Sequence, residues 1–588
     1  MSGRVCHTPR PAPPPVSEEK QTRFVSGFVL SLCVAASASA PVIFVNERAD
    51  RGGDGSSWDR AFQTLTEALA IAPPGIEVWV AEGTYRPEQP SGRDATFTVP
   101  GGVALYGGFQ GIEDDRDDRD PDGFVAELTG DGELYTVVTT DGDDIIIDGF
   151  TITGGNSNGD ITEPPPTRVG GGIYSNDHRI ILRNNRFSEH FAERGGSAVA
   201  LTGTPDIAPL IEDCIFENND GNRGVLEIQW LGIVNDCRFQ NNTTEAIRPS
   251  GTEVIFITDS VFFRNQGTAA TVVFSGFGSQ CIIDGCSFIE NEGVSVGGVF
   301  YGIRGDHIIV NSVFRGNTAT SFAGGVRSDL DPGSSLLIEN SVFTGNVGPR
   351  AGAISVSSPG PVTVTGCTIV GNECTNPVGG GITVTDSGSV TINNSIIYDN
   401  ITANTPSGER ESVAIDPGSS GTANHSAIEF LGDGGFSDRL TINASISANP
   451  MFVDADGADN TFGTADDNFR LQPGSPCIDR GNNLFVGLLV FSDIYSQARF
   501  RDDTGTPDTG VPGGISEVVD IGAAEFQGTT PSDCVADTNG DGMLAPNDFN
   551  AWILAFNNQT PACDQNGDGL CRQNDFNAWI LNFNNGCG

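Results

Sequence analysis

The sequence predicts an all-β solenoid, wound as a parallel β-helix, because one short motif recurs along the middle of the chain. The motif is Asn, Asp or Gly, then Cys, Ser or Asn, then any residue, then Phe or Ile, with Asn three residues later; Asp236-Cys237-Arg238-Phe239 with Asn242 is one copy. The Phe or Ile of successive copies is Phe187, Phe216, Phe239, Phe262, Phe288, Phe314, Phe343, Ile369 and Ile397. Their spacing of 23 to 29 residues is typical of solenoids, in which each repeat packs on its neighbours.

A short aliphatic run precedes each copy of the motif. Ile180-Ile181-Leu182, Cys281-Ile282-Ile283 and Ile308-Ile309-Val310 are examples. Such runs are too short for helices and are typical of buried strands, and the Gly and Asn residues between them predict turns. Coils of this kind stack about 4.8 Å apart. We therefore expect three ladders along the axis: Phe in the core, small Cys or Ser residues, and Asn side chains that pair from turn to turn and bond backbone groups at the bends.

Before the repeats, the sequence predicts a helix between two strands, Val42–Val45 and 76–80. Ser57 is the candidate N-cap, and Pro73-Pro74-Gly75 would end the helix. Its apolar face would consist of Phe62, Leu65, Ala68, Leu69 and Ala72. A single amphipathic helix before a β-solenoid is best explained as a cap over the open end of the core. The acidic run from Glu113 to Asp122 predicts a solvated loop.

The N-terminus has the pattern of an export signal spanning residues 1–38. Basic residues precede the apolar run from Phe24 to Ala36, and Ala36-Ser37-Ala38 offers a small-residue cleavage site. A permanent membrane anchor is the alternative, but the run is short and interrupted by Ser26, Gly27 and Ser31. We expect a secreted or cell-surface protein with no membrane span after cleavage.

The net charge of −45 and the scarcity of lysine exclude several functions. Lys20 is the only lysine and lies within the expected signal, so Schiff-base chemistry, phosphate binding by a P-loop and a lysine base are excluded. A strongly acidic surface repels nucleic acid and anionic lipid and favours divalent cations. We expect no nucleic-acid partner.

The chain has 13 cysteines, of which Cys6 and Cys33 lie in the expected signal. The other 11 are odd in number, so at least one is unpaired or pairs between chains. Four stand on the predicted ladder and are interpreted as small buried residues, with a bridge between Cys214 and Cys237 as an alternative. The ladder cysteines are Cys214, Cys237, Cys286 and Cys367. Bridging is more plausible among Cys534, Cys563, Cys571 and Cys587.

Two calcium-loop patterns lie 27 residues apart near the C-terminus. The expected ligands are Asp537, Asn539, Asp541, the Met543 carbonyl and Asp548 in the first loop, and Asp564, Asn566, Asp568, the Leu570 carbonyl and Asp575 in the second. Hard cations take such oxygen ligands, and Gly542 and Gly569 permit the sharp turn at the sixth position. Each loop continues into Phe-Asn-Ala-Trp-Ile-Leu, so only the exiting helix of an EF-hand is present.

Two such half-hands in tandem resemble a dockerin, the module that docks on cohesin domains. The flanking Cys534 and the closing Gly586-Cys587-Gly588 are similar to GC-type dockerin domains. The resemblance implies two bound Ca²⁺ and a cohesin-type protein as partner. The residues that would select the partner, Pro546-Asn547 and Gln573-Asn574, do not identify it.

Other segments resemble exported β-helix proteins. Gly55-Ser56-Ser57-Trp58, Val78-Trp79-Val80-Ala81 and Leu105-Tyr106-Gly107-Gly108-Phe109 look like the opening of pectate-lyase-like β-helices. Gly-rich stretches such as Ala351-Gly352-Ala353-Ile354, together with Phe-x-x-Asn, resemble the repeats of polymorphic outer-membrane proteins, which are linked to adhesion. These resemblances imply a right-handed parallel β-helix with an N-terminal helical cap and a small α-helical dockerin-like C-terminal module.

The period fades after about residue 401. Segments from Asn449-Pro450-Met451-Phe452 to Asp520-Ile521-Gly522 resemble the closing part of the same β-helix group. Asp454, Asp456, Asp459 and Asp466 could hold a further Ca²⁺ through carboxylate oxygens, and a plain acidic turn is the alternative.

No catalytic constellation stands out, so catalytic residues stay unknown. The histidines outside the signal, which are His178, His190, His307 and His425, share no spacing. Asp177-His178-Arg179 and Asp306-His307 are the local acid–base candidates. Asp213, Asp236 and Asp259 would stack on successive coils, as turn caps or as cation ligands.

The predicted organisation is 1–38 signal peptide, 39–130 cap and first coils, 131–430 repeated coils, 431–526 closing segment, 527–533 linker and 534–588 dockerin-like module. The favoured function is a β-helix docked through its module to a cohesin-type protein, with a flank that contacts polysaccharide or a cell surface. The alternatives are a polysaccharide lyase or glycoside hydrolase of the same fold, and a purely structural envelope protein.

Overall fold

The computed structural model describes most of the chain. The described residues are 41–88, 92–160, 167–203, 208–251, 254–267, 272–274, 280–294, 297–376, 379–402, 412–429, 439–487, 490–514, 517–528, 536, 538, 546–558, 563, 565, 571–572, 575–576, 578–580 and 583. The expected signal peptide, residues 1–38, lies outside them.

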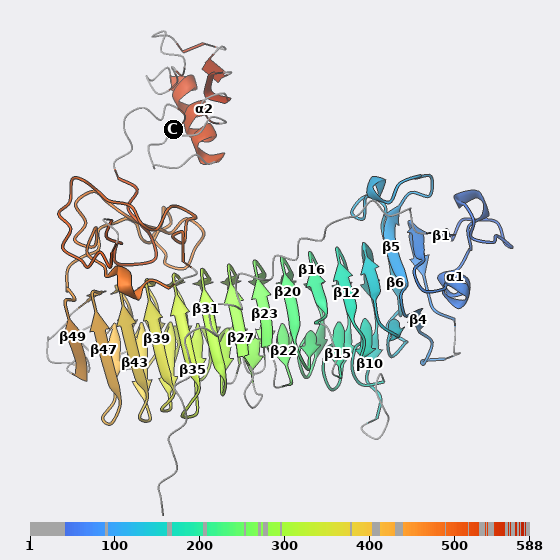
Figure 1. Ribbon diagram of the computed structural model, residues 1–588, viewed down its shortest axis with the longest axis horizontal. Helices are drawn as coiled ribbons and strands as arrows, with labels where there is room; N and C mark the ends of the chain where they lie inside the picture. The colour runs from blue at the N-terminus through green and yellow to red at the C-terminus, as the bar shows by residue number, and fades with distance from the viewer. Residues whose placement is uncertain are drawn as a thin grey trace, which may run out of the picture. The chain divides into compact units, whose positions relative to one another are not determined.

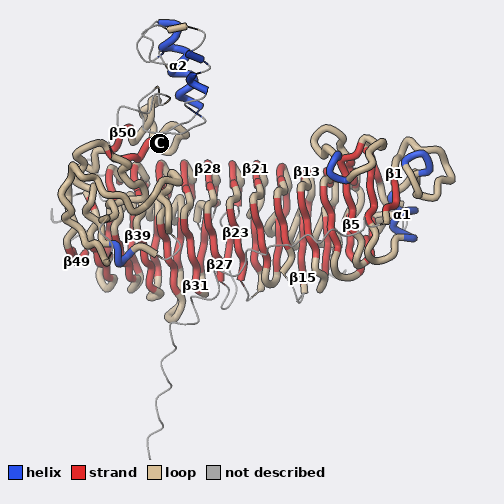
Figure 2. The backbone as a smooth tube through the Cα atoms, turned by 45° about the horizontal axis from the view of Figure 1, so that its top comes forward, coloured by secondary structure: helices blue, strands red, loops and turns tan. Residues whose placement is uncertain are grey.

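Most of the described chain is a right-handed parallel β-helix made of three long sheets, called A, B and C here. Successive coils contribute one strand to each sheet, so strands stack in chain order (Figures 1 and 2). Sheet A has 15 strands, sheet B has 13 and sheet C has 12. The predicted fold class is confirmed.

The strands of sheet A are β1 (Val42–Val45), β2 (Glu77–Ala81), β5 (Ala104–Phe109), β8 (Ile145–Asp148), β12 (Ile180–Arg183), β16 (Leu210–Glu212), β20 (Gly232–Asn235), β23 (Val254–Thr258), β27 (Gln280–Asp284), β31 (Asp306–Val310), β35 (Ser335–Glu339), β39 (Pro361–Thr365), β43 (Ser389–Asn393), β47 (Ser420–Asn424) and β49 (Leu440–Asn443). Those of sheet B are β3 (Gly83–Tyr85), β6 (Ala126–Thr129), β9 (Phe150–Thr153), β13 (Arg186–Ser188), β17 (Ile215–Glu217), β21 (Arg238–Gln240), β24 (Val261–Phe263), β28 (Ser287–Ile289), β32 (Val313–Arg315), β36 (Val342–Thr344), β40 (Thr368–Val370), β44 (Ile396–Tyr398) and β48 (Ala427–Ile428).

Those of sheet C are β4 (Phe97–Pro100), β7 (Val138–Asp141), β11 (Ile173–Asn176), β15 (Val199–Thr202), β19 (Leu226–Ile228), β22 (Ile247–Pro249), β26 (Val272–Phe274), β30 (Phe300–Gly302), β34 (Val326–Ser328), β38 (Ile354–Ser357), β42 (Ile382–Thr385) and β46 (Val413–Ile415). Two short sheets follow sheet B: β10 (Asn156–Ser157), β14 (Phe191–Ala192) and β18 (Asp220–Gly221), and then β25 (Gln266–Gly267), β29 (Glu292–Gly293), β33 (Thr318–Ala319), β37 (Val347–Gly348), β41 (Glu373–Cys374) and β45 (Ile401–Thr402). An antiparallel pair, β50 (Phe452–Asp454) and β51 (Asn468–Leu471), follows the coils.

The first residue of the motif makes the turn from sheet A to sheet B. It has a positive φ in every coil described, for example 50° at Asp236, 50° at Asn311 and 67° at Gly285. Asn, Asp and Gly are the residues that adopt this left-handed conformation at least cost, which explains why the motif admits these three. The predicted turn-cap role of Asp213 and Asp259, with φ of 53° and 50°, follows the same rule.

The core holds a continuous stack of phenylalanine rings. From Phe187 to Phe343, neighbouring ring centroids lie 4.4–5.0 Å apart and each ring is fully buried. Burying each ring contributes roughly 2 kcal/mol of gross transfer free energy. The predicted Phe ladder is confirmed.

The Asn ladder is also confirmed, and it is fully buried. Each amide Nδ2 donates to the Oδ1 of the next Asn; the distances are 3.0 Å from Asn265 to Asn291 and 3.0 Å from Asn291 to Asn317. The same Nδ2 donates to the carbonyl of the core residue one coil back, as Asn291 does to Phe262 at 2.9 Å. Each Oδ1 also accepts from a backbone N–H, so the buried bend is satisfied.

The Ser and Cys positions form the third ladder. The hydroxyl of Ser260 accepts from the backbone N–H of Cys237, and that of Ser312 accepts from Cys286. Cys214 and Cys237 are free and buried, so the alternative of a bridge between them is wrong. Cys563 and Cys571 form a disulfide.

The N-terminal cap helix begins later than predicted. Ser57 precedes a 3-10 turn (η2, Trp58–Arg60), and helix α1 runs from Leu65 to Ile71. The N-cap is Thr64, whose hydroxyl accepts from the N–H of Glu67. Phe62 stays outside the helix because its backbone pairs with Phe44 in the first strand. Leu65, Ala68 and Leu69 are buried against the first coils, as predicted for a cap.

The predicted acidic loop, 113–122, lies outside the sheets and contains one 3-10 turn, η3 (Arg116–Asp118). In the part of the chain that the structure describes, no helix combines the length and apolar character needed to cross a membrane.

The closing segment, defined here as residues 449–528, covers the outer face of sheet B over the last coils. Asn394, a turn residue of the solenoid, donates to the carbonyl of Asn482 at 2.9 Å and accepts from its N–H at 2.8 Å. The N–H of Gly522 donates to the Asn394 carbonyl at 2.8 Å. A second apolar cluster forms between the outward residues Val342, Val370, Ile396 and Ala427 and the segment's Phe469, Leu471, Cys477, Ile478, Ile521, Ala523 and Phe526. The closing segment also contains a 3-10 turn, η5 (Asn483–Phe485).

Candidate functional site

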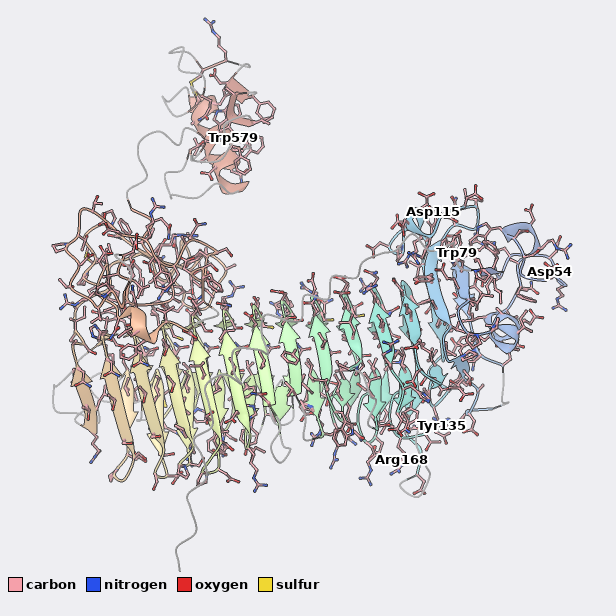
Figure 3. All side chains as sticks on the ribbon, viewed as in Figure 1. Asp54, Trp79, Asp115, Tyr135, Arg168 and Trp579 are labelled. Atoms are coloured by element: carbon pink, nitrogen blue, oxygen red, sulfur yellow. A yellow bond between two sulfur atoms is a disulfide. The ribbon has the colours of Figure 1, made fainter. Side chains whose placement is uncertain are left out.

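The C-terminal module has a small aromatic core of its own. Helix α2 (Pro546–Asn558) and the helical residues around Trp579 supply it. Trp552, Trp579 and Ala536 are buried, and Phe549, Phe556, Phe576 and Phe583 pack against them (Figure 3 labels Trp579). The ring centroids of Trp552 and Trp579 lie 6.5 Å apart.

The two tryptophans bond the module's two repeats to each other. Trp552 Nε1 donates to the carbonyl of Cys563 at 3.2 Å, and Trp579 Nε1 donates to the carbonyl of Ala536 at 3.2 Å. Ala536 directly precedes the first predicted calcium loop and Cys563 directly precedes the second. Each helix therefore fixes the start of the loop that belongs to the other repeat.

Of the ten predicted calcium ligands, the structure describes Asp548 and Asp575. Asp537, Asn539, Asp541, Met543, Asp564, Asn566, Asp568 and Leu570 lie outside the described residues. Both described carboxylates are fully buried at the start of a helix, where a negative charge is stabilised by the helix dipole.

The Asp575 carboxylate closes the second loop. It accepts from the N–H of Gln565 at 3.1 Å and from that of Arg572 at 2.6 Å. Gln565 and Arg572 are the second and ninth residues of the loop, so its two ends meet at the twelfth. A buried carboxylate at this position in each repeat fits a calcium loop, in which residues 537–548 and 564–575 would supply oxygen ligands to one Ca²⁺ each.

The module also exposes apolar side chains at equivalent positions of its repeats. Ile553 is 38% exposed and Ile580, 27 residues later, is 39% exposed. Leu554, next to Ile553, is 63% exposed. The matching exposure gives the module two similar apolar surfaces.

The solenoid histidines do not form an acid–base site. His190 takes the place of the first Asn in the ladder: its Nδ1 accepts from the Gly155 N–H at 3.0 Å and its Nε2 donates to the Ile152 carbonyl at 2.9 Å. Burial lowers the pKa of His190 to about 4. His307 points into the core beside Phe300, whereas Asp306 is exposed, so the pair Asp306-His307 is divided between the two sides of β31.

The candidate triplet Asp177-His178-Arg179 is also dispersed. His178 Nδ1 lies 2.9 Å from Thr140 Oγ1, and Arg179 forms an ion pair with Asp144. His425 is a turn residue with a φ of 47°, and its Nδ1 lies 3.3 Å from the Arg480 carbonyl. The structure brings none of these histidines together.

The stacked turn carboxylates lie as predicted on successive coils. Burial raises the pKa of Asp213, and the charges of Glu212 and Asp236 act in the same direction. Burial also raises the pKa of Asp259, with further increases from Asp284 and Asp236.

In the closing segment, Asp466 accepts from the N–H of Ala458 at 2.8 Å and from the hydroxyl of Thr464 at 2.6 Å. These bonds shape the turn that carries Asp456 and Asp459. The additional calcium site at Asp454, Asp456, Asp459 and Asp466 stays a prediction.

Among the described residues, no segment covers the part of sheet B between the acidic loop and the closing segment, which is called the open face here. It consists of outward side chains of β13, β17, β21 and β24: Arg186, Glu217, Arg238, Gln240 and Phe263. Arg186 forms an ion pair with Glu217, Gln240 Nε2 donates to Glu217 at 2.6 Å, and Arg238 Nε donates to Gln240 at 2.5 Å.

Aromatic and cationic groups adjoin this polar chain. The guanidinium of Arg264 lies 4.6 Å from the ring centroid of Phe263. A cleft of about 690 Å³ borders the open face where the acidic loop meets sheet B. Its polar lining includes Asp117, Arg119, Asp122, Asn184, Arg186 and Asp213.

The family is decided by comparison with known families. The family model described as "Right handed beta helix region" matches residues 135–319 and 298–449, which together exceed half of the chain. The chain belongs to the right-handed β-helix family. The match covers the coils that carry the Phe and Asn ladders of this β-helix protein.

Several solved structures resemble this right-handed β-helix protein. Pectate lyase Pel9A is 13% identical over 84% of this chain and 98% of its own, with a TM-score of 0.30. XylC, solved with xylose, is 11% identical over 83% and 98%, with a TM-score of 0.36. PfbA, a surface adhesin of Streptococcus pneumoniae, is 13% identical over 58% and 88%, with a TM-score of 0.27. No curated protein sequence matches the chain.

Proposed function

We propose that this protein is a β-helix anchored through a calcium-dependent module, which binds two Ca²⁺ and docks on a cohesin-type protein. The observation that carries the proposal is the reciprocal pair of indole bonds from Trp552 and Trp579. Because each bond joins one repeat's helix to the start of the other repeat's loop, metal binding at either loop would support the whole aromatic core. Metal binding of this kind is coupled to folding.

The apolar pair Ile553 and Ile580 supports docking on a protein. Exposed apolar side chains on a small module are typical of a surface that a partner covers. Their position on the calcium-supported helices would make the surface depend on Ca²⁺. We propose that residues 1–38 direct export and that docking takes place outside the cytoplasm.

The docking proposal is tested with purified full chain and a panel of cohesin-type domains, with calcium or with chelator. We expect at least one domain to bind in calcium alone, and Ile553→Glu with Ile580→Glu to abolish binding while calcium uptake persists. Asn550→Ala, an exposed change on the same helix, is the matched control. A chain that binds none of the panel, or binds equally in chelator, would refute calcium-dependent docking.

We further propose that the open face of sheet B contacts polysaccharide. Its chain of Arg186, Glu217, Gln240 and Arg238 offers donors and acceptors for sugar hydroxyls, and Phe263 offers a ring face for the apolar side of a sugar. Arg186 pairs with Glu217 and Arg238 donates to Gln240, so both arginines of the open face already have partners. This favours a face that binds sugar over one in which an arginine acts as a catalytic base.

A panel of uronate and neutral glycans tests the binding role against the alternative of a lyase or hydrolase. We expect Phe263→Ala with Arg238→Ala to weaken retention on at least one glycan, and the parent chain to leave every glycan at its original length. Depolymerisation by the parent chain would overturn the non-catalytic role and favour the enzyme alternative.

A further inference from the structure

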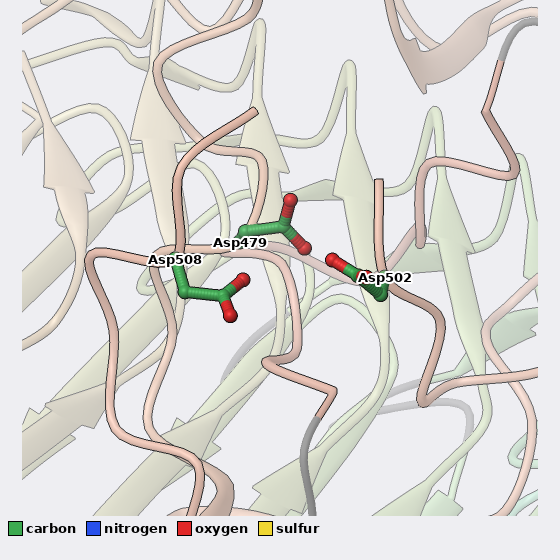
Figure 4. Close-up of side chains that lie close together, drawn as sticks. All are labelled: Asp479, Asp502 and Asp508. Carbon is green, nitrogen blue, oxygen red and sulfur yellow. The ribbon is translucent and has the colours of Figure 1, made fainter. Parts of the chain in front are cut away.

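The closing segment brings three carboxylates together at a place that none of the predicted calcium sites includes. One oxygen each from Asp479, Asp502 and Asp508 lies within 4.8 Å of the others. Figure 4 shows the three side chains directed toward a common space. Within the described ranges, no other group of three or more His, Cys, Asp or Glu has its ligand atoms this close.

Asp479 is the fully buried member of this cluster. Neither of its carboxylate oxygens has a hydrogen-bond partner among the described residues. The N–H of Asp503 is near enough to favour the charged form but does not reach the geometry of a hydrogen bond. Buried carboxylates are normally bonded or bound to a metal, because leaving them unpartnered costs several kcal/mol.

The backbone holds Asp479 firmly in this position. Its N–H donates to Asp520 Oδ1 at 2.8 Å, and its carbonyl accepts from the N–H of Thr509 at 3.0 Å and of Gly510 at 3.1 Å. The two bonds from Thr509 and Gly510 to the Asp479 carbonyl hold the end of the 502–508 loop against Asp479 and place Asp508 beside it. Asp502 and Asp508 are exposed, so the cluster is open to solvent on one side.

The nearby buried cation is already used elsewhere. Arg499 is buried and lies 3.5 Å from Glu525, and its Nη2 donates to the Gly522 carbonyl at 2.6 Å. In the described part of the chain, no arginine forms an ion pair with Asp479, Asp502 or Asp508. Burial, together with the charges of Asp508, Asp502 and Asp503, raises the pKa of Asp479 to about 6.

We propose that Asp479, Asp502 and Asp508 bind one Ca²⁺. Two oxygens bound at about 2.4 Å on opposite sides of this ion are about 4.8 Å apart, which is the limit within which the three ligand atoms lie. The two exposed carboxylates leave one side for water, and Ca²⁺ accepts such mixed oxygen shells. The ion would join residue 479 to the 502–508 loop and so fix the closing segment on sheet B.

The test uses the full chain carrying Asp548→Ala and Asp575→Ala, so that calcium binding by the C-terminal module is removed independently. Equilibrium dialysis then counts bound calcium before and after adding Asp502→Asn with Asp508→Asn. We expect the count to fall by about one per chain. Asp50→Asn with Asp59→Asn changes the same charge on exposed residues far along the chain and should leave the count unchanged. An unchanged count in the Asp502/Asp508 variant would overturn the proposal.

Hydrogen exchange of peptides covering 479–510 gives a second readout. In the parent chain, calcium should slow exchange there, and Asp479→Asn should abolish the difference between calcium and chelator. Because Asn keeps the shape of Asp479 without the buried charge, the variant should be at least as protected as the parent in chelator. The site would be contradicted if Asp479→Asn lost protection both in calcium and in chelator while the parent showed no response to calcium. That result would mean that Asp479 serves the fold without a metal.

Discussion

At the residue scale, each coil depends on a few side chains that satisfy the backbone where it bends. The ladder amides are fully buried, and each bonds both the next Asn and a backbone carbonyl. The sequence rule placed Asn, Cys or Ser, and Phe correctly because each is a local consequence of coil geometry. The positive φ of the turn residue explains why Asn, Asp or Gly stands at the first position of the motif.

Asn291→Ala should destabilise the β-helix by about 2–4 kcal/mol, because the Phe262 carbonyl and the Asn265 N–H lose a buried partner. Urea denaturation followed by circular dichroism measures the change. Thr318→Ala, at an exposed position of the adjacent coil, is the control and should cost under about 0.5 kcal/mol. Equal effects of the two changes would mean that the amide ladder adds no special stability.

His190→Asn should make the β-helix less sensitive to acid. The folded-state pKa of His190 is lowered from 6.5 to about 4, so the unfolded chain binds this proton first as the pH falls. Stability is therefore lost between about pH 6.5 and pH 4, by on the order of 3 kcal/mol, and Asn removes that loss. Unfolding free energies of both chains at pH 7 and pH 4 measure it, and an unchanged slope would contradict a buried neutral histidine.

Some residue-level features could not be predicted. Ser57 was the predicted N-cap, but Phe62 pairs with the first strand, so the helix starts later and Thr64 is its N-cap. Asp306-His307 was an acid–base candidate, but the burial of His307 beside Phe300 places this histidine among the structural residues.

At the scale of elements, the Phe stack determines how much stability a coil loses when its core ring is replaced. Phe262→Ala should cost about 3–5 kcal/mol, because a ring between two stacked neighbours leaves a cavity. Phe262→Ile should cost under about 2 kcal/mol, since Ile369 and Ile397 occupy the same position in later coils. Thermal or urea unfolding compares them, and an Ile variant as unstable as the Ala variant would contradict this interchangeability.

Each calcium loop of the C-terminal module should respond to a change in the helix of the other repeat. Trp552→Phe removes the bond to Cys563 and should weaken calcium binding at the second loop, whereas Trp579→Phe removes the bond to Ala536 and should weaken the first. A loss of about 1 kcal/mol of binding free energy is expected for each. Calorimetric calcium titration of each full-chain variant measures it; if each change affected only its own repeat's loop, the reciprocal arrangement would be wrong.

Prediction of elements succeeded where the signal is local and failed where it is not. Strand runs and the repeated motif can be recognised within about 25 residues. The closing segment has no period, and its cover over sheet B depends on contacts such as Asn394 with Asn482, 88 residues apart. The convergence of Asp479 with Asp502 and Asp508 depends on the same long-range folding.

At the scale of the whole molecule, we infer a division of labour between a scaffold and an anchor. The described coils of the β-helix close their core with apolar and amide ladders. The module has a small aromatic core whose order would depend on two calcium loops. The net charge of −45 suits a chain that works among divalent cations.

The most direct test of this division is hydrogen exchange of the full chain in calcium and in chelator. We predict that peptides around Trp552 and Trp579 lose protection in chelator, while peptides of the coils from Phe187 to Ile397 keep theirs. Equal protection of the module in both conditions, or loss of protection in the coils, would contradict the account.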